Sequence, residues 1–153
     1  MQVDKNTIQT YLELLEKAFV IFRLQPLSRN IRNEISTSRK VYFYDTGVRN
    51  ALISNFNPLN MRNDAGALWE NFLVCERKKV LEYSRIHANI YFWRTTYQQE
   101  IDYVEEREGK LFAYEFKWNP RKRTKIPRRF LEGYPNAETE VIHPDNFYEF
   151  FES

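Results

Sequence analysis

A charged β-hairpin centred on residues 107–110 constrains the fold of this chain more than any other stretch. This segment is turn-like and separates two runs rich in Ile, Val, Tyr, Phe and Trp, which predicts two antiparallel strands that fold about its centre. In that register Asp102 lies opposite Glu115, and Glu100 lies opposite Lys117. The hairpin therefore brings acidic and basic side chains together.

Alternation along the two strands predicts one apolar and one charged face. The apolar face should hold Ile101, Tyr103, Phe112, Tyr114 and Phe116, and the charged face Glu100, Asp102, Ala113, Glu115 and Lys117. The like-charged pair of Asp102 and Glu115 destabilises a hairpin unless something neutralises it, and a divalent cation is one such agent. The competing interpretation is an exposed salt-bridge ladder with a loose register.

A third carboxylate lies in a predicted helix. The stretch from Ala65 to Glu82 holds good helix formers and few breakers, and its expected cap is near Asn63. Glu70 falls on a largely apolar stripe of this helix, where an unpaired carboxylate is costly. Glu70 therefore needs a partner, which is either a basic side chain such as Arg77 or a cation shared with the hairpin carboxylates.

Glu70, Asp102 and the segment 115–117 resemble, in this order, the Glu, Asp, Glu-x-Lys pattern of the PD-(D/E)xK restriction-endonuclease-like superfamily. The resemblance implies a mixed α/β fold with an α-β-β-β-α-β core. Its parts would be the helix 65–82, a strand at 91–94, the two hairpin strands, a short helix or turn at 126–131 and a strand at 138–142, with 145–151 closing helically.

The same resemblance assigns roles to the charged residues. It implies that Glu70, Asp102 and Glu115 bind Mg²⁺ or Mn²⁺, with Asp102, Glu115 and Lys117 as catalytic residues and Gln98 or Glu100 assisting at the edge of the site. Lys117 would orient or activate the attacking water. The Pro-Asp dipeptide that names the superfamily is represented here only by Ile101-Asp102, which departs from its pattern.

A narrower resemblance spans about residues 7–151. The segments that carry it are 40–47, 66–72, 91–94, 100–102, 115–118 and 130–135, which together resemble the domain-of-unknown-function family 4143. Domains of that family typically form the C-terminal part of prokaryotic AAA-type ATPases and follow a winged helix. The resemblance implies an ATPase module outside this chain. Gly109-Lys110 is followed by Leu111, so there is no Walker A phosphate loop here, and we expect no ATP hydrolysis by this chain.

The first 56 residues predict a partial winged helix, separate from a nuclease-like domain over 57–153. An amphipathic helix from Thr7 to about Ala18, with a capping box of Asn6 and Gln9, precedes strands at 20–24 and 40–44. The basic residues Arg29, Arg32, Arg39 and Lys40 of the wing either meet a DNA backbone or only keep the wing soluble. We expect Tyr11, Leu15 and Phe19 to be uncovered and to bind a partner or a second copy.

Charge and composition narrow the partners. The net charge of +2 is nearly balanced, but six basic residues follow the Glu-x-Lys strand, namely Arg121, Lys122, Arg123, Lys125, Arg128 and Arg129. They are either a DNA-binding loop or an ordinary solvated loop. One cysteine and two histidines cannot assemble a zinc site, so oxygen ligands are expected. No apolar run approaches the ~20 residues of a membrane span, and we expect a cytoplasmic protein.

Three hypotheses for function follow. The first is metal-dependent hydrolysis of DNA phosphodiesters by Glu70, Asp102, Glu115 and Lys117. The second is a non-catalytic module that binds nucleic acid or protein for an ATPase and keeps the charged residues as a structural network. The third is a role in oligomerisation alone.

Overall fold

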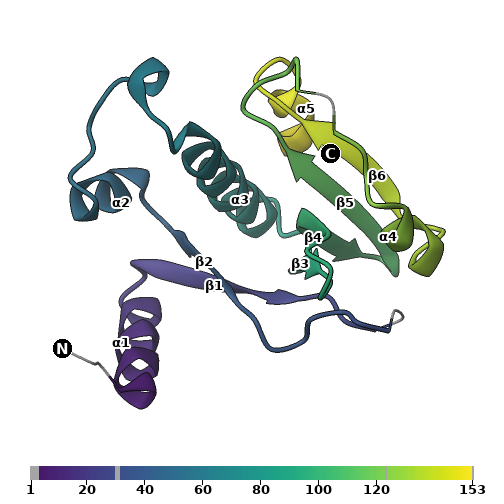
Figure 1. The fold of residues 1–153 in the computed structure, drawn as a ribbon, viewed down its shortest axis with the longest axis horizontal. Helices are drawn as coiled ribbons and strands as arrows, with labels where there is room; N and C mark the ends of the chain where they lie inside the picture. The colour runs from purple at the N-terminus through teal and green to yellow at the C-terminus, as the bar shows by residue number, and fades with distance from the viewer. Residues whose placement is uncertain (1–3, 30–31, 123, 153) are drawn as a thin grey trace.

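The computed structural model describes residues 4–29, 32–122 and 124–152. In this part of the chain, a mixed six-stranded sheet in the order β2-β1-β3-β4-β5-β6 carries helices on both faces (Figure 1). The strands are β1 (Ile21–Pro26), β2 (Lys40–Phe43), β3 (Asn89–Arg94), β4 (Glu100–Arg107), β5 (Lys110–Phe116) and β6 (Glu138–Ile142). The helices are α1 (Lys5–Lys17), α2 (Thr46–Leu52), the short 3-10 helix η1 (Leu59–Met61), α3 (Ala65–Tyr83), α4 (Arg128–Gly133) and α5 (Phe147–Glu152). The predicted mixed α/β class is confirmed.

The sheet joins the N-terminal strands to the hairpin. β1 pairs antiparallel with β2 and parallel with β3, while β3, β4 and β5 form an antiparallel meander and β6 pairs parallel with β5. From α3 onward the elements follow the predicted order, α3-β3-β4-β5-α4-β6. Residues from both predicted parts therefore share one sheet, and the division into 1–56 and 57–153 stays a prediction.

The hairpin register is the predicted one, and Tyr103, Phe112, Tyr114 and Phe116 share one face as predicted, but Ile101 does not. Tyr103 pairs with Tyr114 and Arg107 with Lys110, and the β4–β5 pairs end at Tyr103, so they do not extend to Glu100 and Lys117. The pairing of β4 with β3 shifts between Tyr91 and Trp93, which marks a β-bulge. A bulge interrupts alternation. Ile101 consequently packs with Val104 and Ala113 on the opposite face from Tyr103, Tyr114 and Phe116.

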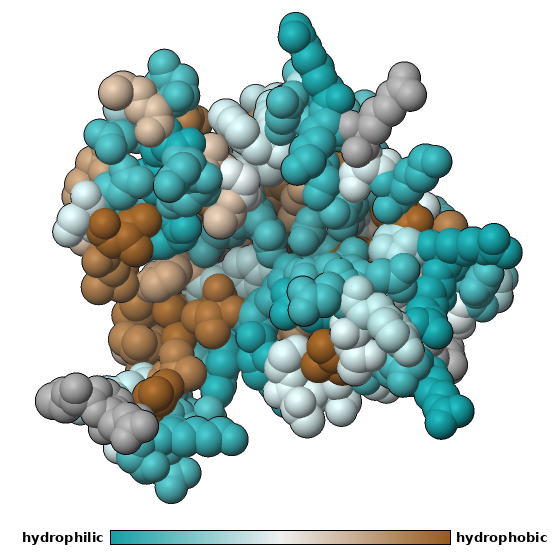
Figure 2. Space-filling view, in the orientation of Figure 1, coloured by the Kyte–Doolittle hydropathy of each residue, from teal (hydrophilic) through white to brown (hydrophobic). Residues whose placement is uncertain are grey.

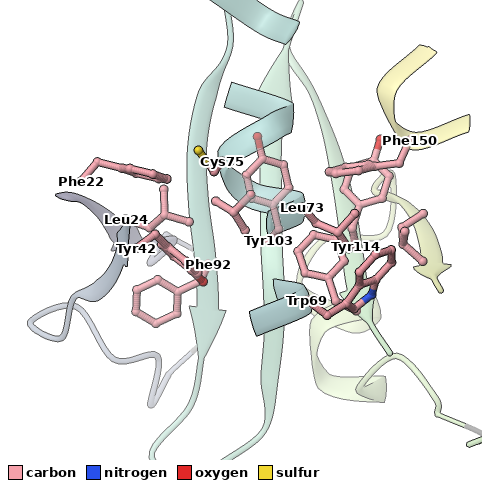
Figure 3. Close-up of a cluster of buried hydrophobic side chains, with 13 residues drawn as sticks. Phe22, Leu24, Tyr42, Trp69, Leu73, Cys75, Phe92, Tyr103, Tyr114 and Phe150 are labelled. Carbon is pink, nitrogen blue, oxygen red and sulfur yellow. The ribbon is translucent and has the colours of Figure 1, made fainter. Parts of the chain in front are cut away.

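Both faces of the sheet are apolar. One core cluster joins α3 and α5 to the sheet through residues such as Leu73, Tyr103 and Phe150 (Figure 3). The other lies under α4 and includes Trp93, Phe130 and Tyr134. Strands buried on both faces leave room for charged side chains only where they are paired, so the expected charged face is replaced by a few specific ionic contacts.

The structure corrects the predicted start of one helix and confirms that of another. Asp4 is the N-cap of α1 and its carboxylate accepts the N–H of Asn6, so the expected capping box of Asn6 with Gln9 does not form. Helix α3 begins at Ala65 as predicted. Its N-cap residue is Asp64, next to Asn63, and the Asp64 side chain makes no capping bond. Arg62 and Arg49 pair with that carboxylate instead.

A buried ion pair fixes α3 to the sheet. Arg77 donates to both carboxylate oxygens of Glu105, at 2.9 and 2.8 Å, and to the carbonyl oxygen of Phe150 at 2.9 Å. Both side chains are fully buried, and the hydroxyl of Tyr103 also donates to Glu105. The suggested pairing of Glu70 with Arg77 is therefore wrong, because Glu105 already occupies that guanidinium.

We expect Arg77→Met to lower the free energy of unfolding by about 3–5 kcal/mol, since it removes the bidentate partner of the buried Glu105 and leaves that charge with Arg107 and the Tyr103 hydroxyl only. Urea denaturation followed by circular dichroism measures the change. Glu82→Gln removes only the exposed Lys78–Glu82 pair and should change stability by less than about 0.5 kcal/mol. A loss below about 1 kcal/mol for Arg77→Met would contradict the importance of the pair.

A candidate site of carboxylates around Lys40

The ammonium group of Lys40 lies among three carboxylates from different elements. Its Nζ atom is 2.8 Å from Glu70 on α3 and 3.4 Å from Asp102 on β4, and it also pairs with Glu100 at the start of β4. The Lys40 side chain is only 14% exposed. An ammonium has three N–H donors, so these contacts use its full capacity.

The pairing of β2 with β1 places Lys40 next to these carboxylates. Lys40 is the first residue of β2 and pairs with Leu24, and its ammonium lies 5.6 Å from the centre of the Phe92 ring. Two residues further along β2, the hydroxyl of Tyr42 donates to the same Glu70 oxygen at 2.6 Å. Alternation along a strand sends residues i and i+2 to one side, which explains why both reach α3.

Sequence reasoning missed Lys40, Tyr42 and Arg94 as members of this site. The side chain of Arg94 donates to Glu100 at 2.8 Å. The spacing of Lys40 and Tyr42 on a predicted strand was the available signal, but it does not say which carboxylates they meet. The sequence placed Lys40 only among the basic residues of the predicted wing, which either meet a DNA backbone or keep the wing soluble.

Glu115 and Lys117 form a separate contact beside this cluster. Their side chains are 2.6 Å apart, and the second carboxylate oxygen of Glu115 is buried with no hydrogen-bond partner. Asp102 reaches toward the same strand by accepting the N–H of Phe116 at 2.9 Å. Tyr114 and Phe116 face α3 and α5. Because side chains alternate along a strand, the Glu115 side chain leaves β5 on the opposite face of the sheet.

Burial and charge shift the pKa values of this site. Burial raises the pKa of Asp102, the negative charge of Glu70 adds to this, and with a smaller contribution from Glu115 the value reaches about 7 despite the nearby Lys40. Burial opposes the charge on Lys40, but the three surrounding carboxylates outweigh it and raise the pKa of Lys40 above its ordinary value. Asp102 is thus the member of the site whose negative charge is least compensated.

Burial and neighbouring charges also shift the pKa values of Glu100 and Tyr42. Burial would raise the pKa of Glu100, but Lys40 and Arg94 lower it overall. Burial and the charge of Glu70 raise the pKa of the Tyr42 hydroxyl well above its usual range, which keeps it a hydrogen-bond donor. The pKa of Glu100 is thus lowered by its two cationic partners, whereas the pKa of Asp102 is raised although Lys40 and the N–H of Phe116 contact its oxygens.

A cavity of about 360 Å³ opens beside the cluster. It is lined by residues of β2, α2, α3 and the ends of β3 and β4, among them Lys40, Arg49, Glu70, Arg94 and Glu100. Two guanidinium groups in its wall leave N–H donors beyond those that Asp64 and Glu100 accept. The site is thus open to solvent on the side where α2 faces α3.

None of the other predicted site residues that the structure describes forms an ion pair with Lys40. Gln98 is exposed in the turn between β3 and β4, where its N–H donates to Thr95. Of the basic loop, Arg121, Lys122 and Lys125 are exposed, Arg128 pairs with Glu132, and Arg129 lies over the ring of Tyr97. Arg123 lies outside the described residues. In Figure 1, α4 and α2 are on opposite sides of the sheet, so the end of this loop is far from the cavity wall that α2 forms.

Within the part of the chain that the structure describes, there is no group of three or more His, Cys, Asp or Glu side chains arranged to hold a metal ion. Glu70 and Asp102 contact one ammonium, and Glu115 contacts another. The three predicted metal ligands are thus close in the fold without surrounding a single point. The metal site stays a prediction.

The chain is thus an α/β domain with a cluster of carboxylates around one lysine, located where β2, α3 and β4 meet. The model of the family described as Domain of unknown function (DUF4143) matches residues 65–149, and the chain belongs to this family. A second family model, Domain of unknown function (DUF8612), matches residues 1–59. Glu70, Asp102 and Glu115 lie in the first match and Lys40 in the second.

Two mycobacterial proteins are similar to the chain. The Uncharacterized protein Rv2008c of Mycobacterium tuberculosis and the Uncharacterized protein Mb2031c of Mycobacterium bovis are each 29% identical to it over 152 residues. The alignment covers 94% of this chain and 32% of each relative, so the chain spans about a third of their length. No solved structure matches the chain. None of the described helices is long and apolar enough to cross a membrane.

We expect Asp102→Asn to be more stable than the wild type at pH 8 by about 1–3 kcal/mol. The folded-state pKa is raised to about 7, so the folded protein binds more protons than the unfolded chain between roughly pH 4 and 7. The wild type therefore loses stability as pH rises through that window, whereas the variant lacks this titration.

Urea denaturation of both proteins at pH 4.5, 6 and 8 measures the difference between their free energies of unfolding. The difference should be largest at pH 8 and nearly vanish at the lowest pH. A difference that does not depend on pH would show that Asp102 titrates normally. Glu149→Gln, on the exposed surface of α5, serves as the matched control.

Proposed function

We propose that this chain is a nuclease-like domain that hydrolyses DNA phosphodiesters with Mg²⁺ or Mn²⁺. The least compensated charge of the site carries the proposal. Asp102 is largely but not fully buried beside two further carboxylates, and its pKa is raised to about 7. A divalent cation stabilises such a concentration of negative charge. The unpartnered buried oxygen of Glu115 fits the same interpretation, since a metal would supply the missing partner.

Asp102, Glu115 and Glu70 would hold the metal, which when bound supplies an activated water and charge stabilisation at the scissile phosphate. The ammonium of Lys117 is held by Glu115 at 2.6 Å. There it orients the attacking water and stabilises negative charge on the phosphate oxygens. The exposed basic residues Arg121, Lys122 and Lys125 follow in the chain and suit a phosphate backbone.

Metal binding would require Lys40 to move. Its ammonium now neutralises Glu70 and Asp102, and a cation shared by these carboxylates would occupy the same region. Glu115 would have to turn toward Asp102 as well. The movement of Lys40 is local, because this residue begins a strand at the edge of the sheet, whereas Glu115 would have to turn from the other face of the sheet near the end of β5.

The second candidate is a non-catalytic module of a larger assembly. The contacts of Lys40 favour it, since one ammonium already compensates carboxylates from α3 and β4 and makes the cluster a structural network. In this case the domain would bind nucleic acid or protein without cutting. For either candidate, we place the chain as part of a longer polypeptide with an AAA-type ATPase module, consistent with the greater length of the matched relatives.

Cleavage of a labelled DNA duplex tests the first candidate. We expect Mn²⁺-dependent cleavage by the wild type and at least a 100-fold loss of rate for Asp102→Ala and for Lys117→Ala, because one removes a metal ligand and the other the charge at the phosphate. Lys110→Ala in the exposed hairpin turn is the control and should cleave like the wild type. DNA that stays intact at every protein concentration would leave only the non-catalytic module.

Lys40→Met separates the two candidates without a substrate. If a metal binds these carboxylates, removing the competing ammonium should raise the affinity for Mn²⁺ at least tenfold, and Mn²⁺ should raise the melting temperature of Lys40→Met more than that of the wild type. Lys125→Met removes an equal charge from an exposed position and should bind Mn²⁺ as the wild type does. If the cluster is purely structural, Lys40→Met loses stability and Mn²⁺ does not restore it.

A further inference from the structure

Helix α1 turns the side that carries Gln9, Leu12 and Glu16 toward its own protein and leaves most of its apolar residues exposed. Arg23 of β1 donates to Glu16 at 2.5 Å and to Gln9 at 3.3 Å, which tethers this side of the helix to the sheet. None of the residues of α1 is buried. An amphipathic helix normally packs by its apolar stripe, so α1 is oriented to pack against something other than the rest of this chain.

The outward apolar residues of α1 continue onto the segment from α2 to η1. We call the following set the apolar surface: Ile8, Tyr11, Leu15 and Phe19 at α1, and Val48, Leu52, Ile53, Phe56, Leu59 and Met61 from α2 to η1. All of these side chains are exposed. In Figure 2 the hydrophobic side chains run along the left of the molecule, from the region of α2 down to α1.

The extent of this surface exceeds what a monomer normally leaves in water. Tyr11, Phe19 and Phe56 are 62%, 75% and 72% exposed, and aromatic side chains of that size together offer on the order of 400 Å². The aliphatic members bring the total to roughly 1,000 Å², against about 300–600 Å² for the largest patch on a typical monomer. Each partner in a stable complex buries about 800 Å².

The backbone of Phe19 is in a strained conformation that is unfavourable for most residues other than glycine. Its φ is +55°, in the left-handed region just after the end of α1, and the N–H of Val20 bonds to the carbonyl of Leu15 as in a helix-terminating motif. Glycine is the usual residue there because other residues are strained by about 1 kcal/mol. Phe19 has a ring contact with Tyr44, at 6.2 Å between centroids, but most of its side chain packs against nothing in its own chain.

We propose that the apolar surface is the contact between two copies of this chain in a symmetric dimer. The ten residues of the surface carry no charge, so the same surface on a second copy meets no repulsion, as a twofold interface requires. Its area matches that of a stable dimer. In the dimer α1 of one copy packs against the partner's apolar surface, and Phe19 contributes binding energy that offsets its backbone strain.

Sedimentation equilibrium of the 153-residue chain tests this proposal. We expect a dimer at about 10 µM protein, and a monomer at the same concentration for Tyr11→Glu combined with Phe56→Glu, which place a charge in both parts of the surface. Tyr83→Glu is the control, because Tyr83 is an 82% exposed tyrosine outside the surface. It should remain dimeric.

Phe19→Gly distinguishes a lost contact from a damaged fold. It should weaken dimerisation at least tenfold while the isolated subunit unfolds at the same or higher urea concentration, because glycine relieves the left-handed strain. Circular dichroism confirms that each variant is folded.

Two results would overturn the proposal. One is a wild type that stays monomeric up to about 100 µM, which would leave the surface to another part of a longer polypeptide. The other is a dimer that survives both Tyr11→Glu with Phe56→Glu and Phe19→Gly, which would place the interface elsewhere.

Discussion

The contact of one lysine with three carboxylates holds the edge of this fold together. Lys40 reaches Glu70 on α3 and Asp102 on β4 from the first position of β2. Without a cation at that point, three partly buried negative charges would face each other in a region of low dielectric. The chain compensates them with its own ammonium, which ties the first residue of β2 to α3 and β4.

This contact also links the two stretches that the family models match. Lys40 belongs to the stretch 1–59 and its carboxylate partners to the stretch 65–149. The parallel pairing of β1 with β3 makes the same connection through the backbone. Any change that moves β2 would therefore expose the carboxylates, so the state of the N-terminal region and the charge of the site are physically coupled.

Features that depend on a local sequence pattern were predicted correctly. The prediction failed where a single extra residue changes the alternation of side chains along a strand. The turn at 107–110 and the long helix containing Glu70 followed from composition and spacing, and both are present. The faces of β4 did not follow, because a single bulged residue shifts the alternation. The partners of Glu70 could not be predicted either. They come from Lys40 and Tyr42, which are about thirty residues away and reach α3 only through the pairing of β2 with β1.

The bulge in β4 explains why Asp102 belongs to the cluster. Ile101 and Val104 both pack on the α4 side although three positions separate them, which regular alternation forbids. One extra residue between them frees Asp102 and Tyr103 to lie toward α3, where Asp102 meets Lys40 while Tyr103 packs in the core. An unbulged strand would keep Asp102 on the opposite face from Tyr103. Bulges recur beside functional sites for this reason. The irregularity that defeats the simple pattern is thus the feature that assembles the site.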